Sequence, residues 1–206
     1  STEDIVADKI LVDGPRGVAY ADYTAGNAGN EDGRLPLYHY YNDYPLAYWP
    51  SDPFDPESML SYSVNYALGA YLTRNYVGSP GGGAEFLRAA VQNPYTDYRA
   101  LQSAAAAAGS SDSFGTMLRK WGAAVLLSDT AGVPAGYAYD TGGAVDSTLG
   151  SVSYKLGSIN LYNYRYYWGA GPSQYLDGPY LYSAADAVIG PASGQAPTSN
   201  IYYAVG

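Results

Sequence analysis

The chain has no cysteine among its 206 residues, and this absence excludes two kinds of structure. Without thiols there is neither a disulfide framework nor a thiolate zinc site. Basic residues are also scarce, with 10 Lys and Arg against 19 Asp and Glu, which gives a net charge of −9. We therefore expect neither nucleic acid nor an anionic membrane as a partner, because both are bound through cationic side chains.

The sequence also lacks a long apolar run and the common catalytic motifs. No apolar stretch is long enough to span a bilayer, so no transmembrane segment is predicted. HExxH, GxSxG and a glycine-rich dinucleotide loop are missing, and His39 is the only histidine. From the residues alone we therefore expect no self-sufficient catalytic site and assign no metal ligands.

Tyrosine and glycine are abundant, with 25 residues of each, whereas phenylalanine occurs only 3 times. Two interpretations remain open. Tyrosine can replace phenylalanine in the core and in half-buried strands, which we favour. Alternatively, tyrosine together with Gly, Ser and Asn is typical of exported proteins and of recognition surfaces.

Residues 55–77, DPESMLSYSVNYALGAYLTRNYV, form the stretch around which we expect the chain to be organised. Asp55 and Pro56 suit the start of a helix, and the glycine and proline at positions 78 and 80 suit its end. Apolar residues recur at spacings of three and four, which places the following on one face: Leu60, Val64, Leu68, Tyr71 and Leu72.

Three further helical patterns follow with short connections. They cover residues 84–93, a segment that starts at Thr96 and a segment that starts at Asp112, with Thr96 and Asp112 as the predicted caps. Helices joined by short loops favour one helical layer. Residues 1–10 resemble the end of another helix, and residues 17–33 are predicted to be a loop because they show little periodicity.

The last third of the chain has a different pattern. Residues 129–143 are rich in turn formers, and strands are predicted at residues 152–156, 159–164, 180–183 and 200–205. The predicted fold class is α+β, mainly α. A helical layer spans residues 1–130, and a Tyr/Gly-rich, β-rich extension spans residues 131–206 and caps that layer within one compact domain.

Residues 34–53 carry His39 among several aromatic residues. Tyr38, His39, Tyr40 and Tyr41 are therefore candidates for an aromatic ligand platform, and His39 is a candidate metal ligand. A zinc site needs further ligands at suitable spacing, which the sequence does not offer. We favour the simpler interpretation, in which His39 is a hydrogen-bonded histidine in a loop.

Taken in order, the segments SYSVNYALGAYLTRNY, AEFLRAAVQNPYTDYRALQSA and DSFGTMLRKWGAAVLLSD resemble the helical C-terminal half of secreted bacterial zinc metallopeptidases. These are gluzincin-type enzymes, and the resemblance is strongest to the hyicolysin-like family. It covers roughly residues 1–130, and the tyrosine-rich tail resembles the β extension of some members. The HExxH helix and the later glutamate that hold zinc in that family are absent from these 206 residues.

The resemblance implies that this chain is the substrate-cleft-forming, C-terminal portion of an exported metallopeptidase, secreted or held at the cell surface. An N-terminal portion or chain with the HExxH helix would be its partner, would hold the zinc and would cleave a peptide substrate. Tyr66-Ala67-Leu68-Gly69 matches the family's Tyr-x-x-Gly pattern. Tyr66 is therefore the candidate catalytic residue, a donor to the tetrahedral intermediate. The alternative is that Tyr66 is a core aromatic residue.

Alone, the chain holds no cofactor of its own and is expected to be inactive, because hydrolysis in this family needs the zinc-bound water. A second function therefore stays open. The chain is then a non-catalytic, peptidase-derived binding or structural protein of the cell surface. It would use its tyrosine-rich loops to contact a partner.

Overall fold

The protein is described from a computed structural model, which places residues 31–52, 54–76, 83–139, 145–149, 152–156, 161–163, 165–166, 174–175, 179, 181–183 and 198–204. This part of the chain is mainly helical, as the sequence predicts. Its helices are α3 (Glu31–Tyr40), α4 (Ser58–Asn75), α5 (Ala84–Val91), α6 (Tyr98–Ala107) and α7 (Phe114–Leu126). The helix end predicted at residues 1–10 lies outside the described residues.

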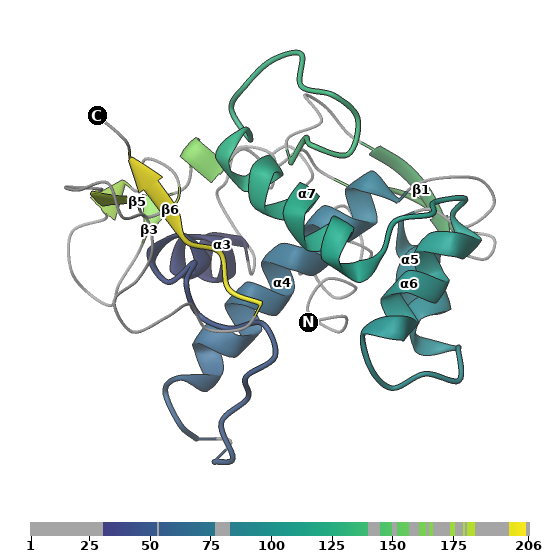
Figure 1. Ribbon diagram of the computed structural model, residues 1–206, viewed down its shortest axis with the longest axis horizontal. Coiled ribbons are helices and arrows are strands. Elements are labelled where there is room, and N and C mark those ends of the chain that lie inside the picture. Colours follow the sequence, from purple (N-terminus) through teal and green to yellow (C-terminus); the bar gives the residue numbers. More distant parts are fainter. Residues whose placement is uncertain are drawn as a thin grey trace.

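Helix α4 runs through the middle of the ribbon, with α3 on one side and with α5 and α6 at its other end (Figure 1). It is buried on nearly all sides, and its buried residues include Leu68 and Tyr71 but also Ser61 and Thr73. The central position predicted for this segment is confirmed. The expectation that only one face is covered is too narrow, because neighbouring elements surround the helix.

The polar side chains of α4 tolerate burial because they bond to the helix's own carbonyl groups. Ser63 Oγ donates to Met59 O over 2.7 Å, and Thr73 Oγ1 donates to Gly69 O over 3.0 Å. A nitrogen of the buried Arg74 guanidinium donates to Ala70 O over 2.9 Å. These bonds satisfy groups that would otherwise be costly to remove from water.

The predicted caps need correction at three helices. Helix α4 begins at Ser58, after a turn in which Asp55 Oδ1 accepts from the Glu57 amide over 2.9 Å. Helix α6 is capped by Asp97 and not by Thr96. Helix α7 is capped by Ser113, and the side chain of the predicted cap Asp112 instead binds Tyr76 and Lys120.

The last three residues of the predicted loop 17–33, with the aromatic residues that follow them, belong to helix α3. Leu35, Tyr38 and His39 are buried at helical spacing, and α3 packs against α4. Gly33 and Pro36 obscure this pattern in the sequence because both are poor helix formers. His39 therefore lies in a helix and not in the predicted loop.

The strands of the described region are short. They are β1 (Val145–Leu149), β2 (Val152–Leu156), β3 (Arg165–Tyr166), β4 (Gln174–Tyr175), β5 (Leu181–Ser183) and β6 (Tyr202–Ala204). β1 and β2 pair antiparallel, β3 and β4 pair antiparallel, and β5 and β6 pair parallel. The predictions at 152–156, 180–183 and 200–205 each contain one of these strands, whereas β1, β3 and β4 were missed.

One predicted strand is wrong in its described part. Within residues 159–164, the segment Leu161–Asn163 is a 3-10 helix, η2. The Ser128 hydroxyl accepts a hydrogen bond from the Leu161 amide over 3.1 Å, and the Leu161 side chain is fully buried. A tertiary contact therefore overrides the β propensity of this segment.

Residues 198–204 connect the end of α3 to α7 through hydrogen bonds. Asn42 and Asn200 exchange two hydrogen bonds, from Asn42 Nδ2 to Asn200 O over 2.8 Å and from Asn200 N to Asn42 O over 3.1 Å. The Tyr202 hydroxyl donates to Gly122 O on α7 over 3.0 Å. A Cβ at Gly122 would lie 2.9 Å from Asn200 Oδ1, so this contact depends on glycine.

Replacing Gly122 by alanine should destabilise the protein, because the added methyl group displaces Asn200 from α7. We expect the free energy of unfolding to fall by about 1 to 3 kcal/mol in urea titrations. Gly115→Ala, on the same helix, is the matched control, since no atom lies closer than 3.9 Å to its new Cβ. It should leave stability unchanged or raise it by up to about 1 kcal/mol. Equal effects at both positions would contradict the packing described.

Candidate functional site

The candidate catalytic residue Tyr66 lies in the core. Its side chain is fully buried in α4, among residues that include Ala67, Tyr71 and Tyr139. The hydroxyl of Tyr139 donates to the carbonyl of Ala67, next to Tyr66 in the chain. No substrate reaches the Tyr66 phenol in this arrangement, which fits the core interpretation of this residue.

The four residues of the predicted aromatic platform do not share one surface. Tyr38 and His39 are each 1% exposed, whereas Tyr40 is 50% and Tyr41 38% exposed. Tyr38 stacks on Trp121 of α7, with ring centroids 5.5 Å apart. Helix α3 thus turns two of the four side chains inward and leaves only Tyr40 and Tyr41 accessible to a ligand.

Burial governs the charge of His39. Removal from water disfavours the imidazolium ion and lowers the pKa of His39 to about 3, so the side chain is neutral at physiological pH. In the described part of the chain, no group of three or more His, Asp and Glu side chains is placed to hold a metal ion. None of the helices in that part combines the length and apolar character needed to cross a membrane.

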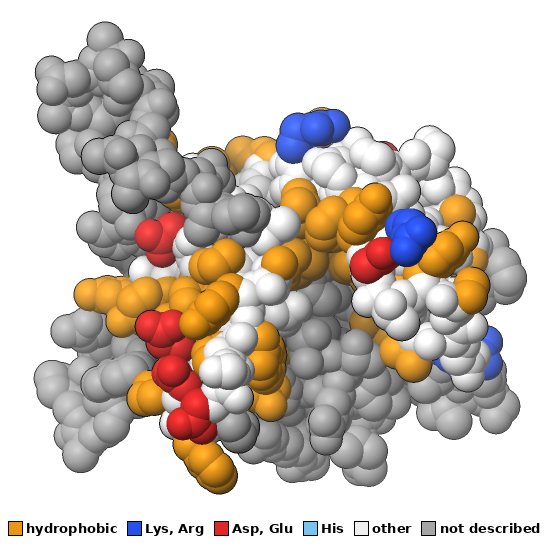
Figure 2. Space-filling view, turned by 60° about the horizontal axis from the view of Figure 1, so that its bottom comes forward, with side chains coloured by type: hydrophobic (Ala, Val, Ile, Leu, Met, Phe, Trp, Pro, Cys, Tyr) orange, Lys and Arg blue, Asp and Glu red, His pale blue; other side chains and the backbone are white. Residues whose placement is uncertain are grey.

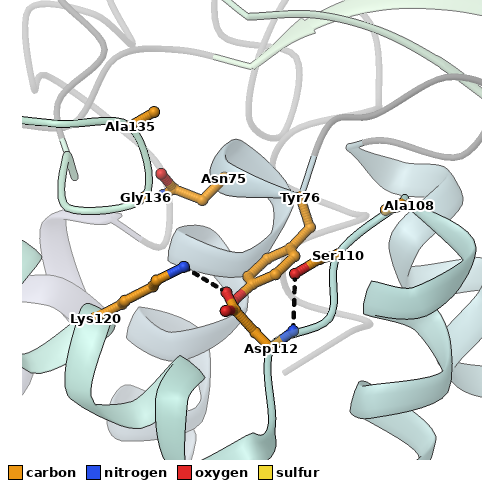
Figure 3. A pocket seen from close by; sticks show the side chains of 9 residues that line it. Asn75, Tyr76, Ala108, Ser110, Asp112, Lys120, Ala135 and Gly136 are labelled. Atoms are coloured by element: carbon orange, nitrogen blue, oxygen red, sulfur yellow. Dashed lines mark hydrogen bonds and ion pairs between the residues drawn. The ribbon is translucent and has the colours of Figure 1, made fainter.

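A pocket of about 230 Å³ lies where α4 and α6 end and α7 begins. Figure 3 shows Lys120 and Asp112 pointing toward each other beside the ring of Tyr76. Lys120 Nζ lies 2.6 Å from Asp112 Oδ2, and the Tyr76 hydroxyl donates to the same oxygen over 2.9 Å. The Asp112 amide donates to Ser110 Oγ over 3.1 Å.

The electrostatics of this pocket suit a structural role. Burial, the largest single influence, acts to raise the pKa of the Asp112 carboxyl, but the bonds from Lys120 and Tyr76 bring it below its ordinary value. Burial and then the bond to Asp112 raise the pKa of the Tyr76 phenol, which stays a donor. The cluster joins the Asp112 carboxylate to the Lys120 and Tyr76 side chains, and so ties α7 to the end of α4.

A second candidate site is exposed and lies at the start of α4. We call it the aromatic surface, and it consists of the exposed residues Tyr48, Trp49, Phe54 and Met59 with the partly buried residues Tyr44 and Tyr62. Phe54 is 91% exposed and Trp49 is 50% exposed. Trp49 meets Tyr62 edge to face at 4.9 Å, and Tyr44 meets Tyr48 in the same way at 5.7 Å.

The segment that carries these residues is held against α4 by hydrogen bonds to its backbone. Ser61 Oγ donates to Tyr48 O over 3.0 Å, and Asn65 Nδ2 donates to Leu46 O over 3.3 Å. Thr198 Oγ1 accepts from the Ala47 amide over 3.2 Å. Turns fix the far end, where Asp52 Oδ1 accepts from the Phe54 amide over 2.9 Å.

Proline stiffens the same segment, whose described residues include Pro45, Pro50 and Pro56. Each proline fixes its own φ angle and narrows the conformations of the residue before it.

Thr198, which accepts a hydrogen bond from the Ala47 amide, has a φ of 65°, which is unusual for a β-branched residue. Such backbone strain persists only where the surrounding contacts impose it.

The binding residues predicted from the sequence lie earlier in the chain than the aromatic surface. The prediction centred on the only histidine, whereas the aromatic surface starts at Tyr44, after the end of α3. The available signal was the alternation of aromatic residues, prolines and carboxylates in residues 43–57. What the sequence did not show is which aromatic side chains point outward.

Comparisons with known proteins do not assign this chain to a family. Neither the protein-family models, nor the curated proteins, nor the solved structures contain a match to this chain. The resemblance to hyicolysin-like peptidases therefore stays a prediction.

The buried, neutral state of His39 gives a prediction about pH. Because its folded-state pKa lies below the unfolded value near 6.5, only the unfolded state takes up a proton as the pH falls below 6.5. Relative to His39→Gln, the wild type should lose about 1.4 kcal/mol of unfolding free energy per pH unit between pH 6 and pH 4. Urea unfolding of both proteins across this range measures the difference. Parallel stability curves would show that His39 is accessible to protons in the folded state.

Proposed function

We propose that this protein is a non-catalytic recognition module that binds its partner through the aromatic surface. The observation that carries the proposal is the exposure of Trp49 and Phe54 on a segment that α4 holds in place. A soluble protein rarely leaves such side chains grouped at its surface without a binding role. Large aromatic residues are also the ones that contribute most of the binding energy at interfaces.

The support that α4 gives to this segment favours binding. A partner that meets a flexible loop loses affinity because the loop must be ordered, whereas a surface that is already ordered avoids this cost. The hydrogen bonds from Ser61 and Asn65 supply that order from a buried helix. The aromatic rings add contact area at a low cost in side-chain entropy, as tyrosine-rich binding loops do.

The tyrosines of the chain serve two purposes in this proposal. Tyr38, Tyr66, Tyr71 and Tyr139 fill the core, so the interpretation of tyrosine as a substitute for phenylalanine applies there. Tyr44 and Tyr48 belong to the aromatic surface. We infer a secreted or cell-surface location from the same composition, which is tyrosine-rich and poor in lysine and arginine.

The other function expected from the sequence stays a prediction. In it, the chain forms the substrate cleft of a zinc metallopeptidase and relies on an N-terminal portion for zinc, general base and activity. The β-rich cap expected over residues 131–206 belongs to the same prediction. The burial of Tyr66 does not favour this function, since the phenol is shielded from any substrate.

The proposal is tested by screening the protein against a displayed library of random dodecapeptides and against a glycan array. We expect ligands whose binding is lost in the double variant Trp49→Ala/Phe54→Ala, because it removes the two most prominent anchors. Tyr98→Ala is the matched control, since Tyr98 is an exposed aromatic residue on α6. It should keep the same ligands.

Circular dichroism should show equal helix content in all three proteins, because the replaced side chains are exposed. If neither screen yields a ligand that depends on Trp49 and Phe54, the proposed function is wrong. If such ligands are glycans only, the function stands with a carbohydrate partner.

A further inference from the structure

We propose that the partner bound by the aromatic surface is an extended peptide segment rich in arginine. This inference rests on the proposed function and names the class of partner. It is carried by the charges that accompany the aromatic rings. Rings and carboxylates together form the environment in which a guanidinium group binds best, stacked on a face and held at its edge.

Carboxylates lie among the residues of the aromatic surface. The Tyr44 hydroxyl donates to Glu57 Oε2 over 3.4 Å, and Asp52 lies two residues before Phe54 in the chain. Asp52 Oδ1 and Asp55 Oδ1 each accept one backbone amide. Each of these two carboxylates keeps a second oxygen, so the turn bonds fix the position of the negative charge without using all of its hydrogen-bonding capacity.

Elsewhere in this chain, an arginine is bound by both an aromatic ring and a carboxylate. The guanidinium carbon of Arg99 lies 5.0 Å from the centroid of the Tyr95 ring. The Arg99 guanidinium also binds Asp97, with Nη2 2.8 Å from Oδ2 and Nε 2.9 Å from Oδ1. A tyrosine ring and an aspartate two residues apart thus hold one arginine. The aromatic surface offers a similar pair of groups where the Tyr44 hydroxyl meets Glu57.

No Lys or Arg side chain from the same part of the sequence neutralises the negative charge of the aromatic surface. The sequence contains no Lys or Arg between Arg34 and Arg74, whereas it contains Asp43, Asp52, Asp55 and Glu57. The ion pairs formed within the described residues lie at Glu85, Asp97 and Asp112, so none of them involves Asp52, Asp55 or Glu57.

Figure 2 shows acidic side chains between hydrophobic ones at the end of the molecule where α4 begins, and the Lys and Arg side chains in this view lie elsewhere. A partner that supplies positive charge therefore completes this surface.

The overall charge selects among the possible occupants. A second copy of this chain, an anionic glycan or an anionic membrane would bring negative charge to a protein whose net charge is already −9. A neutral glycan would stack on the rings but would leave the carboxylates without a counter-charge. A segment rich in arginine matches both the rings and the carboxylates, and the field of the whole protein draws it in.

The test uses fluorescence anisotropy of the full chain with a labelled octapeptide of alternating glycine and arginine in 150 mM NaCl. Trp49→Ala/Phe54→Ala should weaken binding by about tenfold or more, since truncation of anchor residues costs at least about 1.4 kcal/mol. Asp52→Asn/Glu57→Gln keeps the shape of both side chains and should weaken binding about three- to fivefold. A peptide with citrulline in place of arginine should not bind measurably.

Two control variants separate this surface from general attraction to an acidic protein. Tyr98→Ala removes an exposed ring on α6, and Asp129→Asn removes an exposed carboxylate after α7; each should change affinity less than twofold. Equal losses in the control variants would overturn the proposal, as would equal binding of the citrulline peptide or no binding of the arginine peptide.

Co-sedimentation with phosphatidylcholine vesicles that depends on Trp49 and Phe54 would assign the surface to a lipid interface and would also overturn the proposal. The screens described for the proposed function keep the two failures apart. Ligands that depend on the aromatic surface but lack cationic groups would leave the recognition function standing and refute the arginine-rich partner alone. The absence of any such ligand would refute both.

Discussion

The burial of helix α4 on nearly every side is the constraint on which the other elements depend. A helix that carries serine, threonine and arginine can be enclosed only if those groups find partners, and here Ser63, Thr73 and Arg74 bond to carbonyls of the preceding turn. Once α4 is enclosed, α3, α5 and the turns after α7 have a common surface to pack on. The buried ring of Tyr71 illustrates this, since its hydroxyl donates to Gly136 O over 2.6 Å.

The same helix connects the core to the exposed end of the molecule. Ser61 and Asn65 lie on α4 and donate to the backbone of the segment that precedes it. The buried helix thereby orders a surface segment whose Tyr44 and Leu46 also pack against the core. The exposed Phe54 side chain and the exposed half of Trp49 do not help the protein fold, because these parts stay in contact with water. Their display is better explained by recognition than by stability.

Several helices could be predicted from the sequence because the residues that determine them lie close together in the chain. Apolar spacing identified α4, α5, α6 and α7, and Gly109, with a φ of 82°, ends α6 where the alanine run stops. Helix α3 was missed, since Gly33 and Pro36 are locally unfavourable and its burial against α4 outweighs them. The cap of α7 was misassigned because the Asp112 side chain binds Tyr76, which is distant in the sequence, and Lys120, which lies further along α7.

The candidate site was predictable only in part. An aromatic platform was expected, but the sequence does not reveal that Tyr38 and His39 face the core while Tyr48 and Trp49 face water. That division depends on the rotation of α3 against α4 and on hydrogen bonds between residues far apart in the chain. The role carried over to Tyr66 from the peptidase resemblance depended on an open cleft, and its burial could be seen only in three dimensions.

The central claim is that α4 holds the aromatic surface in one conformation before any partner arrives. Backbone ¹⁵N relaxation of the free protein tests this claim most directly, using the amides of residues 46–57 and those of α4. The account predicts backbone order parameters S² of about 0.85 in both segments, as for rigid backbone. Values below about 0.6 in residues 46–57, with α4 still rigid, would contradict it and show that the aromatic side chains are not preorganised.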